Sequence, residues 1–197
     1  TPKPSSAASD VYKRQADMSL TLDEETVIDA AAAVSLLKNR EDIDSDRVFV
    51  LGHSLGGQAI PRIHAALASA ENRAAGYIFL AAPARNLAEI TREQYDFLYS
   101  FNPVLTNTQK AQKEEIYAQL DRLDNVSALD DSEVLMGAYA FYWKDLLAYD
   151  PVSSASEITE PCFVLQGEED YQVTMADFSL CQLSLIHISE PTRRRGI

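Results

Sequence analysis

A serine flanked by glycines lies where an apolar run gives way to an amphipathic stretch. Residues 52–57, GHSLGG, carry the G-x-S-x-G pattern of a nucleophile elbow, a sharp turn that lifts a serine hydroxyl above the strand ends. We expect Gly52 and Gly56 to be required, because a Cβ two residues on either side of Ser54 would collide with neighbouring backbone. The pattern predicts nucleophilic attack by Ser54 on a carbonyl carbon. The alternative is a tight turn in which Ser54 merely caps the following helix.

A serine that attacks a carbonyl needs donors for the negative charge that develops on the carbonyl oxygen. The backbone N–H of Leu55 lies at the positive end of the predicted helix and is the candidate donor of this oxyanion hole. An elbow normally takes a second donor from a loop after an earlier strand. We find no strand pattern before Thr21, so we expect this second donor to be missing from the chain.

The elements around the elbow predict a parallel sheet. Apolar runs with turn residues beside them are typical of buried strands, and helical periodicity separates them. The predicted strands are 48–51, 77–81 and 162–165, and the predicted helices are 21–39 and 56–69. We expect the first strand to be buried on both faces, and the apolar side of helix 21–39, which includes Ile28 and Leu36, to pack against the sheet. This alternation favours the α/β class, with helices on both faces of a parallel sheet.

A long insertion separates the second and third predicted strands. Residues 86–150 are too many for a plain crossover, and we predict a helical cap with helices at 109–123 and 131–148. More than half of the chain's aromatic residues lie between Tyr95 and Tyr149. They either line a pocket for an apolar substrate group or simply hold the cap to the sheet.

Together, residues 52–57 and the downstream run CFVLQGEEDYQV at 162–173 resemble the α/β-hydrolase superfamily. The nearest likeness is to its bacterial esterase and serine aminopeptidase-like branch with a helical cap. The resemblance covers about residues 16–182 and implies that Asp170 is the acid that orients a catalytic histidine. Glu168, Glu169 and Asp150 are competitors for this role. The structural alternative for Asp170 is to cap a short helix that begins near Thr174.

Ser54 and Asp170 would form a catalytic triad with a histidine base, and that histidine is missing from the predicted site. The sequence contains His53, His64 and His187. His53 is next to the nucleophile and its ring should project elsewhere, whereas His64 lies ten residues into the helix, well below the catalytic edge. His187 follows Asp170 too closely for the usual intervening elements. The resemblance implies a histidine beyond residue 182 of the natural protein, so we expect this chain to be nearly inactive by itself.

The two ends of the chain differ in composition from its interior. Residues 1–15 lack periodicity, and residues 183–197 end with three consecutive arginines in an otherwise acidic protein. Both strings resemble translated sequencing adapters, so we expect both tails to be non-native and residues 16–182 to be a partial hydrolase domain. The alternative is a pair of genuine disordered tails. The formal net charge of −13 argues against nucleic-acid binding, and no apolar run is long enough to span a bilayer. No metal or nucleotide motif is present, so we expect no cofactor. The compartment and the oligomeric state stay open.

These residues predict a serine hydrolase that cleaves carboxylic esters or short peptide amides through an acyl-enzyme on Ser54. Its partner is a small-molecule ester or peptide substrate. The alternative is a non-catalytic hydrolase-fold protein that binds a ligand or a partner. It predicts no histidine near Asp170 in the natural sequence, and no reaction of Ser54 with an active-site-directed phosphonate.

Overall fold

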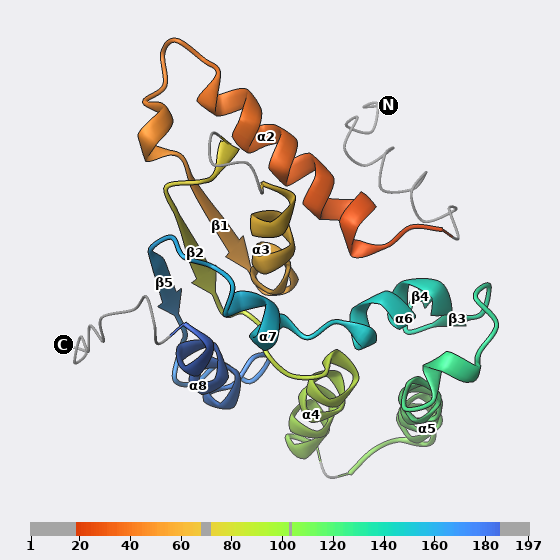
Figure 1. Cartoon of the computed structure of the whole chain (residues 1–197). Helices are drawn as coiled ribbons and strands as arrows, with labels where there is room; N and C mark the ends of the chain where they lie inside the picture. The colour runs from red at the N-terminus through yellow and green to blue at the C-terminus, as the bar shows by residue number, and fades with distance from the viewer. Residues whose placement is uncertain (1–18, 68–71, 103, 186–197) are drawn as a thin grey trace, which may run out of the picture. The chain divides into compact units, whose positions relative to one another are not determined.

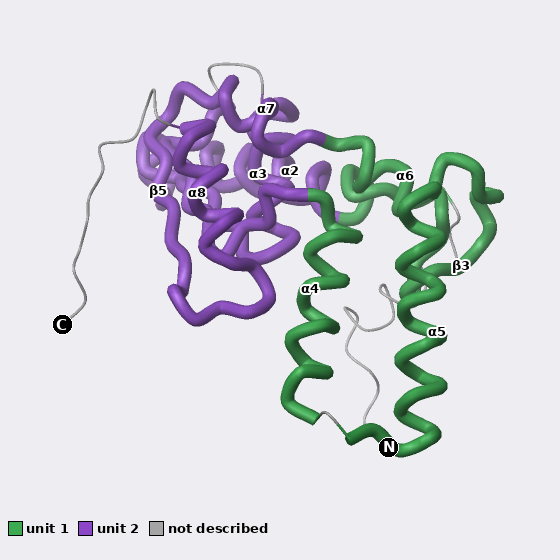
Figure 2. The backbone as a smooth tube through the Cα atoms, turned by 90° about the horizontal axis from the view of Figure 1, so that it is seen from below, with its two compact units in different colours: residues 1–25, 86–149 green, residues 26–85, 150–197 purple. Residues whose placement is uncertain are grey.

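A computed structural model of the chain describes residues 19–67, 72–102 and 104–185. The described residues form two compact units (Figures 1 and 2). One unit contains residues 26–85 and 150–185 and carries both predicted site residues, Ser54 and Asp170. The other contains residues 19–25 and 86–149, and most of it is the segment predicted to form a cap.

The first unit is built on a parallel sheet of β1 (Phe49–His53), β2 (Gly76–Leu80) and β5 (Cys162–Leu165). The strand order is β1-β2-β5, with Phe49 opposite Gly76 and Tyr77 opposite Cys162. The three strands therefore end at the same edge of the sheet (Figure 1). The prediction for β5 is confirmed residue for residue, and those for β1 and β2 are displaced by only one or two residues.

Helices flank this sheet. They are α2 (Ile28–Lys38), α3 (Leu55–Ala66), α7 (Pro151–Ala155) and α8 (Met175–Ser184), with a π-helical turn, η1 (Asp23–Val27), before α2 and a 3-10 turn, η2 (Ser45–Arg47), before β1. Helix α3 packs on β1 and β2, and α8 packs on β5. The α/β class with a parallel sheet and flanking helices is confirmed.

The burial of β1 differs from the prediction. Its residues alternate, with Val50 buried and with Phe49 and Leu51 55% and 58% exposed. In β5, Phe163 and Leu165 are exposed on the same face, because the register pairs Leu51 with Ile78 and Ile78 with Phe163. The expectation that the first strand is buried on both faces is therefore wrong for the described residues.

The expectation for the first helix also needs correction. Helix α2 contacts α3 and η2, and its side chains Ile28 and Leu36 are 56% and 68% exposed. Val34 is buried, and Val27 is buried just before the helix begins. An alanine-rich helix has no strongly apolar side, so the position of two or three larger side chains decides which side packs.

The second unit contains helices α4 (Leu87–Ser100), α5 (Asn107–Leu123) and α6 (Ala140–Ala148), a 3-10 turn, η4 (Val126–Ala128), and a small antiparallel pair, β3 (Val134–Leu135) and β4 (Ala138–Tyr139). Helix α5 is close to its predicted range, and it begins at a capping box formed by Thr106 and Gln109.

The predicted helix 131–148 is wrong in its first half. Met136 and Gly137 have positive φ angles of 49° and 83°, which turn the chain between β3 and β4 and restrict the helix to 140–148. Trp143 on α6 donates its indole N–H to the carbonyl of Leu135, at 2.8 Å, and so holds the hairpin on the helix. None of the described helices is long and apolar enough to cross a membrane.

Candidate active site

Ser54 lies between β1 and α3 in a conformation that few L residues adopt. Its φ is 53° and its ψ is −124°. The side chain makes no capping hydrogen bond to α3, although Ser54 occupies the N-cap position. Its amide donates to the carbonyl of Leu80 at the end of β2, at 2.9 Å, so the turn is held to the sheet. The geometry matches a strained nucleophile elbow and speaks against a merely capping serine.

The glycines around Ser54 differ in the space that each would leave for a Cβ atom. A Cβ on Gly52 would lie 2.2 Å from the carbonyl oxygen of Gly56, and one on Gly57 would lie 2.6 Å from the Cβ of Ala82. A Cβ on Gly56 would meet nothing within 4 Å. The predicted steric need is therefore confirmed for Gly52 and wrong for Gly56. Gly57 packs closely against Ala82, a residue of the loop after β2.

The N-terminus of α3 provides a donor beside the serine. The amides of Gly57 and Gln58 donate to the carbonyl of Ser54, at 2.8 and 3.2 Å, and so close the first turn of the helix. Within the described part of the chain, the N–H of Leu55 has no backbone acceptor. It lies at the positive end of the helix, as a donor to a developing oxyanion would.

Asp170 lies in the loop that follows β5, at the same edge of the sheet as Ser54. Its Oδ1 accepts hydrogen bonds from the amides of Gln172 and Val173, at 2.8 and 3.2 Å, and its Oδ2 lies 3.3 Å from Nε2 of Gln166. The carboxylate is half-buried. These bonds fix its orientation before α8 begins at Met175, so Asp170 does not cap that helix.

The competing carboxylates have other surroundings. Glu168 and Glu169 are exposed in the loop after β5. Asp150 caps α7, because its Oδ1 accepts from the amides of Val152 and Ser153, both at 3.0 Å. Asp170 is therefore the carboxylate of this group that combines partial burial with a place on the loop beyond β5.

The described histidines occupy positions that do not suit a base for Ser54. His53 is exposed and belongs to the side of β1 that carries Leu51. His64 is 6% exposed near the end of α3, where its ring packs edge-on against Tyr77 at the beginning of β2. It lies far along α3 from Ser54, as expected. His187 lies outside the described residues.

Two comparisons with known proteins bear on this geometry. The model of the acetyl xylan esterase (AXE1) family matches residues 21–138, a range that contains the elbow, β1, β2 and α3. The chain belongs to the acetyl xylan esterase family. It is also 37% identical over 158 residues to Esterase EstD of Thermotoga maritima, an alignment that covers 80% of this chain and 35% of that protein. The chain thus spans about a third of the length of this relative.

Membership of the acetyl xylan esterase family explains the architecture. The parallel sheet with its flanking helices is a partial α/β-hydrolase fold, and it places the candidate residues of the site at one edge. The order β1-β2-β5 separates the elbow strand from the Asp170 strand by one strand. A carboxylate two strands away can orient an imidazole that approaches the serine hydroxyl.

One buried carboxylate of this esterase-family chain was not found by reading the sequence. Asp177 on α8 is completely buried and bonded to Arg85, in the loop after β2. In the sequence it looks like an ordinary acidic residue in the first turn of a helix. Its partner is 92 positions away, so no local pattern links the two.

Proposed function

We propose that this chain carries the nucleophile and the acid of a serine esterase. The observation that carries the proposal is Ser54, with a φ of 53° and a hydroxyl that does not cap the helix beginning beside it. A strained serine at a strand-to-helix turn is costly for a fold, by about 1–3 kcal/mol, and such strain is concentrated at functional sites. Membership of an esterase family supports an ester as the substrate.

In the proposed reaction, Oγ of Ser54 attacks the ester carbonyl carbon and its proton passes to a histidine base. The oxyanion that forms accepts a hydrogen bond from the N–H of Leu55. When the tetrahedral intermediate collapses, the C–O bond of the ester breaks and the alcohol leaves with the proton from the histidine. Water then attacks the acyl-enzyme by the reverse sequence, which releases the carboxylic acid and restores Ser54.

We assign to Asp170 the role of orienting the imidazole ring of the histidine base. Its Oδ1 is occupied by two backbone N–H groups, which hold the carboxylate oriented in the loop after β5. In this role it selects the tautomer of the histidine and stabilises the imidazolium. The base is assigned to sequence outside the described residues, because His53 and His64 do not occupy suitable positions. The second oxyanion donor is assigned there too, because no strand pattern precedes Thr21.

The substrate we propose is a small carboxylic ester, with an acetyl group as the first acyl group to test. The support is the family description, acetyl xylan esterase, together with the relative called Esterase EstD. Cleavage of short peptide amides is the second reaction to compare, because the same acyl-enzyme chemistry serves both bonds.

The test measures turnover of p-nitrophenyl acetate and of an acetylated sugar by the whole enzyme, meaning this chain together with the sequence that supplies its base. Ser54→Ala should lower kcat about a millionfold. Ser179→Ala is the matched control, because its hydroxyl donates to the helix carbonyl of Met175, its one partner among the described residues, and its loss should leave kcat unchanged. Full turnover by Ser54→Ala would overturn the assignment of Ser54, and no ester turnover by the native enzyme would favour a non-catalytic binding protein.

A further inference from the structure

The loop after β2 lies between the nucleophile and the acid. The amide of Ser54 donates to the carbonyl of Leu80, and the next amide along the chain, that of Ala81, donates to the carbonyl of Leu165 at the end of β5, both at 2.9 Å. The strand that leads to this loop is thus bonded on one side to the elbow and on the other side to the strand that leads to Asp170. Whatever fixes the loop fixes the spacing between them.

The beginning of this loop is under backbone strain. Ala81 has a φ of 47°, which is unfavourable for a residue with a Cβ, and it is buried. A strained turn persists only when its surroundings hold it in place. On the elbow side, the hold is the close approach of Gly57 to Ala82, which leaves no room for a Cβ on the glycine.

On the side of Asp170, a buried ion pair fixes the loop after β2. Asp177, 0% exposed, accepts hydrogen bonds at its Oδ1 from the amides of Ala84 and Arg85, at 2.9 and 3.1 Å. Its Oδ2 accepts from Nε and Nη2 of Arg85, at 3.2 and 2.9 Å. One carboxylate therefore fixes both the backbone of the loop and the side chain of Arg85 to the first turn of α8.

Helix α8 begins directly after the turn that holds Asp170. Nη2 of Arg85 also lies 3.5 Å from the hydroxyl of Thr174, the N-cap residue of α8, which follows Val173 and its bond to Asp170. The guanidinium of Arg85 thus extends from the loop after β2 to Thr174, at the end of the turn of residues 170–173, which we call the acid turn.

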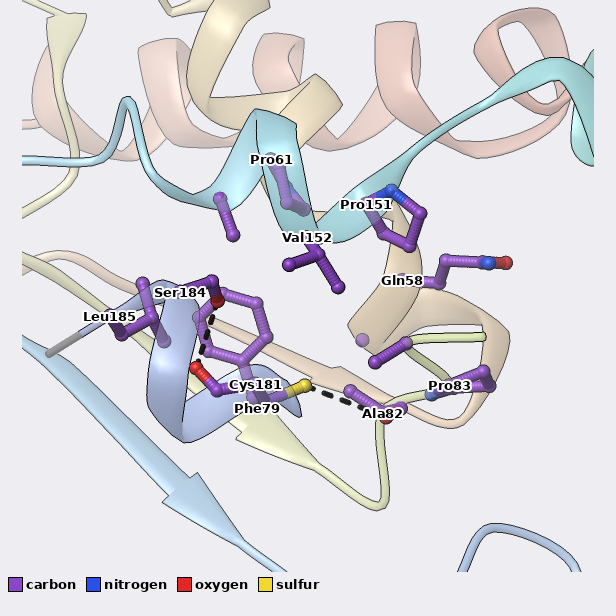
Figure 3. Close-up of a pocket in the computed structure, with 13 residues that line it drawn as sticks. Gln58, Pro61, Phe79, Ala82, Pro83, Pro151, Val152, Cys181, Ser184 and Leu185 are labelled. Atoms are coloured by element: carbon purple, nitrogen blue, oxygen red, sulfur yellow. Dashed lines mark hydrogen bonds between the residues drawn. The ribbon is translucent and has the colours of Figure 1, made fainter. Parts of the chain in front are cut away.

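Other contacts between α8 and the loop after β2 surround a small apolar pocket. The small apolar pocket in Figure 3 lies between α3, the loop after β2, α7 and α8, and it is lined by Gly57, Ala82 and Cys181 among others. The thiol of Cys181 lies 3.8 Å from the carbonyl oxygen of Ala82, as the dashed line shows. Apart from Asp177, the contact between α8 and the loop is therefore mainly apolar and does not by itself set an orientation.

We infer that Arg85 and Asp177 are positioning residues of the esterase, which set the acid turn of Asp170 against the nucleophile elbow of Ser54. The inference rests on the proposed function. It differs from a role in folding alone, because the pair connects two catalytic segments at the edge of the sheet. A less buried ion pair, Arg73 with Glu160, joins residues at the opposite end of the sheet.

The test is steady-state kinetics of the whole enzyme on p-nitrophenyl acetate, with the number of active sites titrated for each variant. Asp177→Asn should lower kcat per titrated site about 10- to 100-fold, because a small misplacement of a catalytic group costs that much, while KM stays within about twofold. Arg85→Lys keeps the charge but loses the two-pronged bond, and it should show a smaller loss of kcat. Arg85→Lys alone then tests the positioning role of the pair if Asp177→Asn does not fold.

Glu160→Gln is the matched control and should leave kcat per titrated site unchanged. A kcat per site within twofold of the native enzyme in both Asp177→Asn and Arg85→Lys would overturn the inference and leave the pair a purely structural role. Ser54→Ala is measured alongside. If it lacks turnover while the two positioning variants are normal, only the inference fails; if it keeps full turnover, the proposed function fails as well.

Discussion

Polar residues at the two ends of the parallel sheet are bound by different groups, by backbone at one end and by other side chains at the other. At the carboxyl end, Ser54 and Asp170 are half-buried and are oriented mainly by backbone groups. At the amino end, His64, Arg73 and Glu160 bind one another. Nη1 of Arg73 lies 2.8 Å from Oε1 of Glu160 and 3.0 Å from Nε2 of His64.

Burial explains the protonation states at the amino end. Burial lowers the pKa of His64, although Glu160 opposes this, and the ring is therefore neutral near pH 7. Burial also raises the pKa of Tyr77 to about 12, with Glu160 adding to the effect. Burial alone would raise the pKa of Glu160, but the hydrogen bond and charge of Arg73, a backbone hydrogen bond and the proximity of His64 together lower that pKa.

The comparison teaches how to separate chemistry from structure in this fold. A group held by backbone amides keeps a side-chain atom available for a substrate or a histidine, whereas a group bound by other side chains has already used its bonding capacity. On this criterion the titratable cluster at the amino end is structural, even though it contains a buried histidine and a carboxylate.

The largest expected effect is a difference in kcat between a variant at the carboxyl end of the sheet and one at the amino end. Asp170→Asn should lower kcat of the whole enzyme about 10⁴-fold, because an amide cannot stabilise the imidazolium or select its tautomer. Glu160→Gln, at the amino end, should leave kcat unchanged. Ester turnover measured at substrate saturation checks both variants. Equal losses of kcat in the two variants would remove the distinction between the ends.

The next effect concerns the backbone of the elbow. Gly52→Ala should lower the free energy of unfolding by at least about 3 kcal/mol, because the new Cβ would lie 2.2 Å from the backbone oxygen of Gly56. Gly56→Ala is the control; the site is open and lies in a helix, so stability should be unchanged or slightly higher. Urea unfolding of both variants checks this. A tolerated Gly52→Ala would contradict the tight turn.

Much of this carboxyl end was predictable from the sequence because its signals are local. Six consecutive residues encode the elbow, and β5 with its loop to Asp170 is one continuous run. The hairpin at 134–139 was missed because Val134, Leu135, Ala138 and Phe141 have helical spacing, whereas the positive φ of Met136 has no strong sequence signal.

Other features depend on residues that are distant in sequence. The bond between Arg85 and Asp177 joins positions 92 apart, and each residue looks unremarkable alone. Similarly, the exposure of Phe49 and Leu51 depends on what packs against that side of the sheet, and a continuous apolar run does not encode it.

A moderate effect is expected at the amino end. Glu160→Gln should lower the free energy of unfolding by about 1–3 kcal/mol, because the carboxylate is 14% exposed and its loss leaves Arg73 and His64 without their charged partner. Urea unfolding at pH 7 measures the loss. Arg92 and Asp121 form an exposed pair for comparison, and Asp121→Asn should cost less than 1 kcal/mol. Equal costs would mean that burial does not strengthen the cluster.

The smallest effect concerns the pH dependence of stability. Because burial lowers the pKa of His64 below its usual value of about 6.5, the unfolded chain binds the proton more readily. This contribution to stability is therefore present above about pH 6.5 and is lost as the pH falls below that value. His64→Gln should reduce the slope of stability against pH in this window, measured by urea unfolding at several pH values. An unchanged slope would contradict the assignment.

The most direct test of the central claim is to map the reaction of the whole enzyme with a fluorophosphonate. We expect one covalent adduct on the tryptic peptide that contains Ser54, absent from Ser54→Ala and formed much more slowly by Asp170→Asn. No adduct, or an adduct on another serine such as Ser153, would contradict the assignment of Ser54 as the nucleophile.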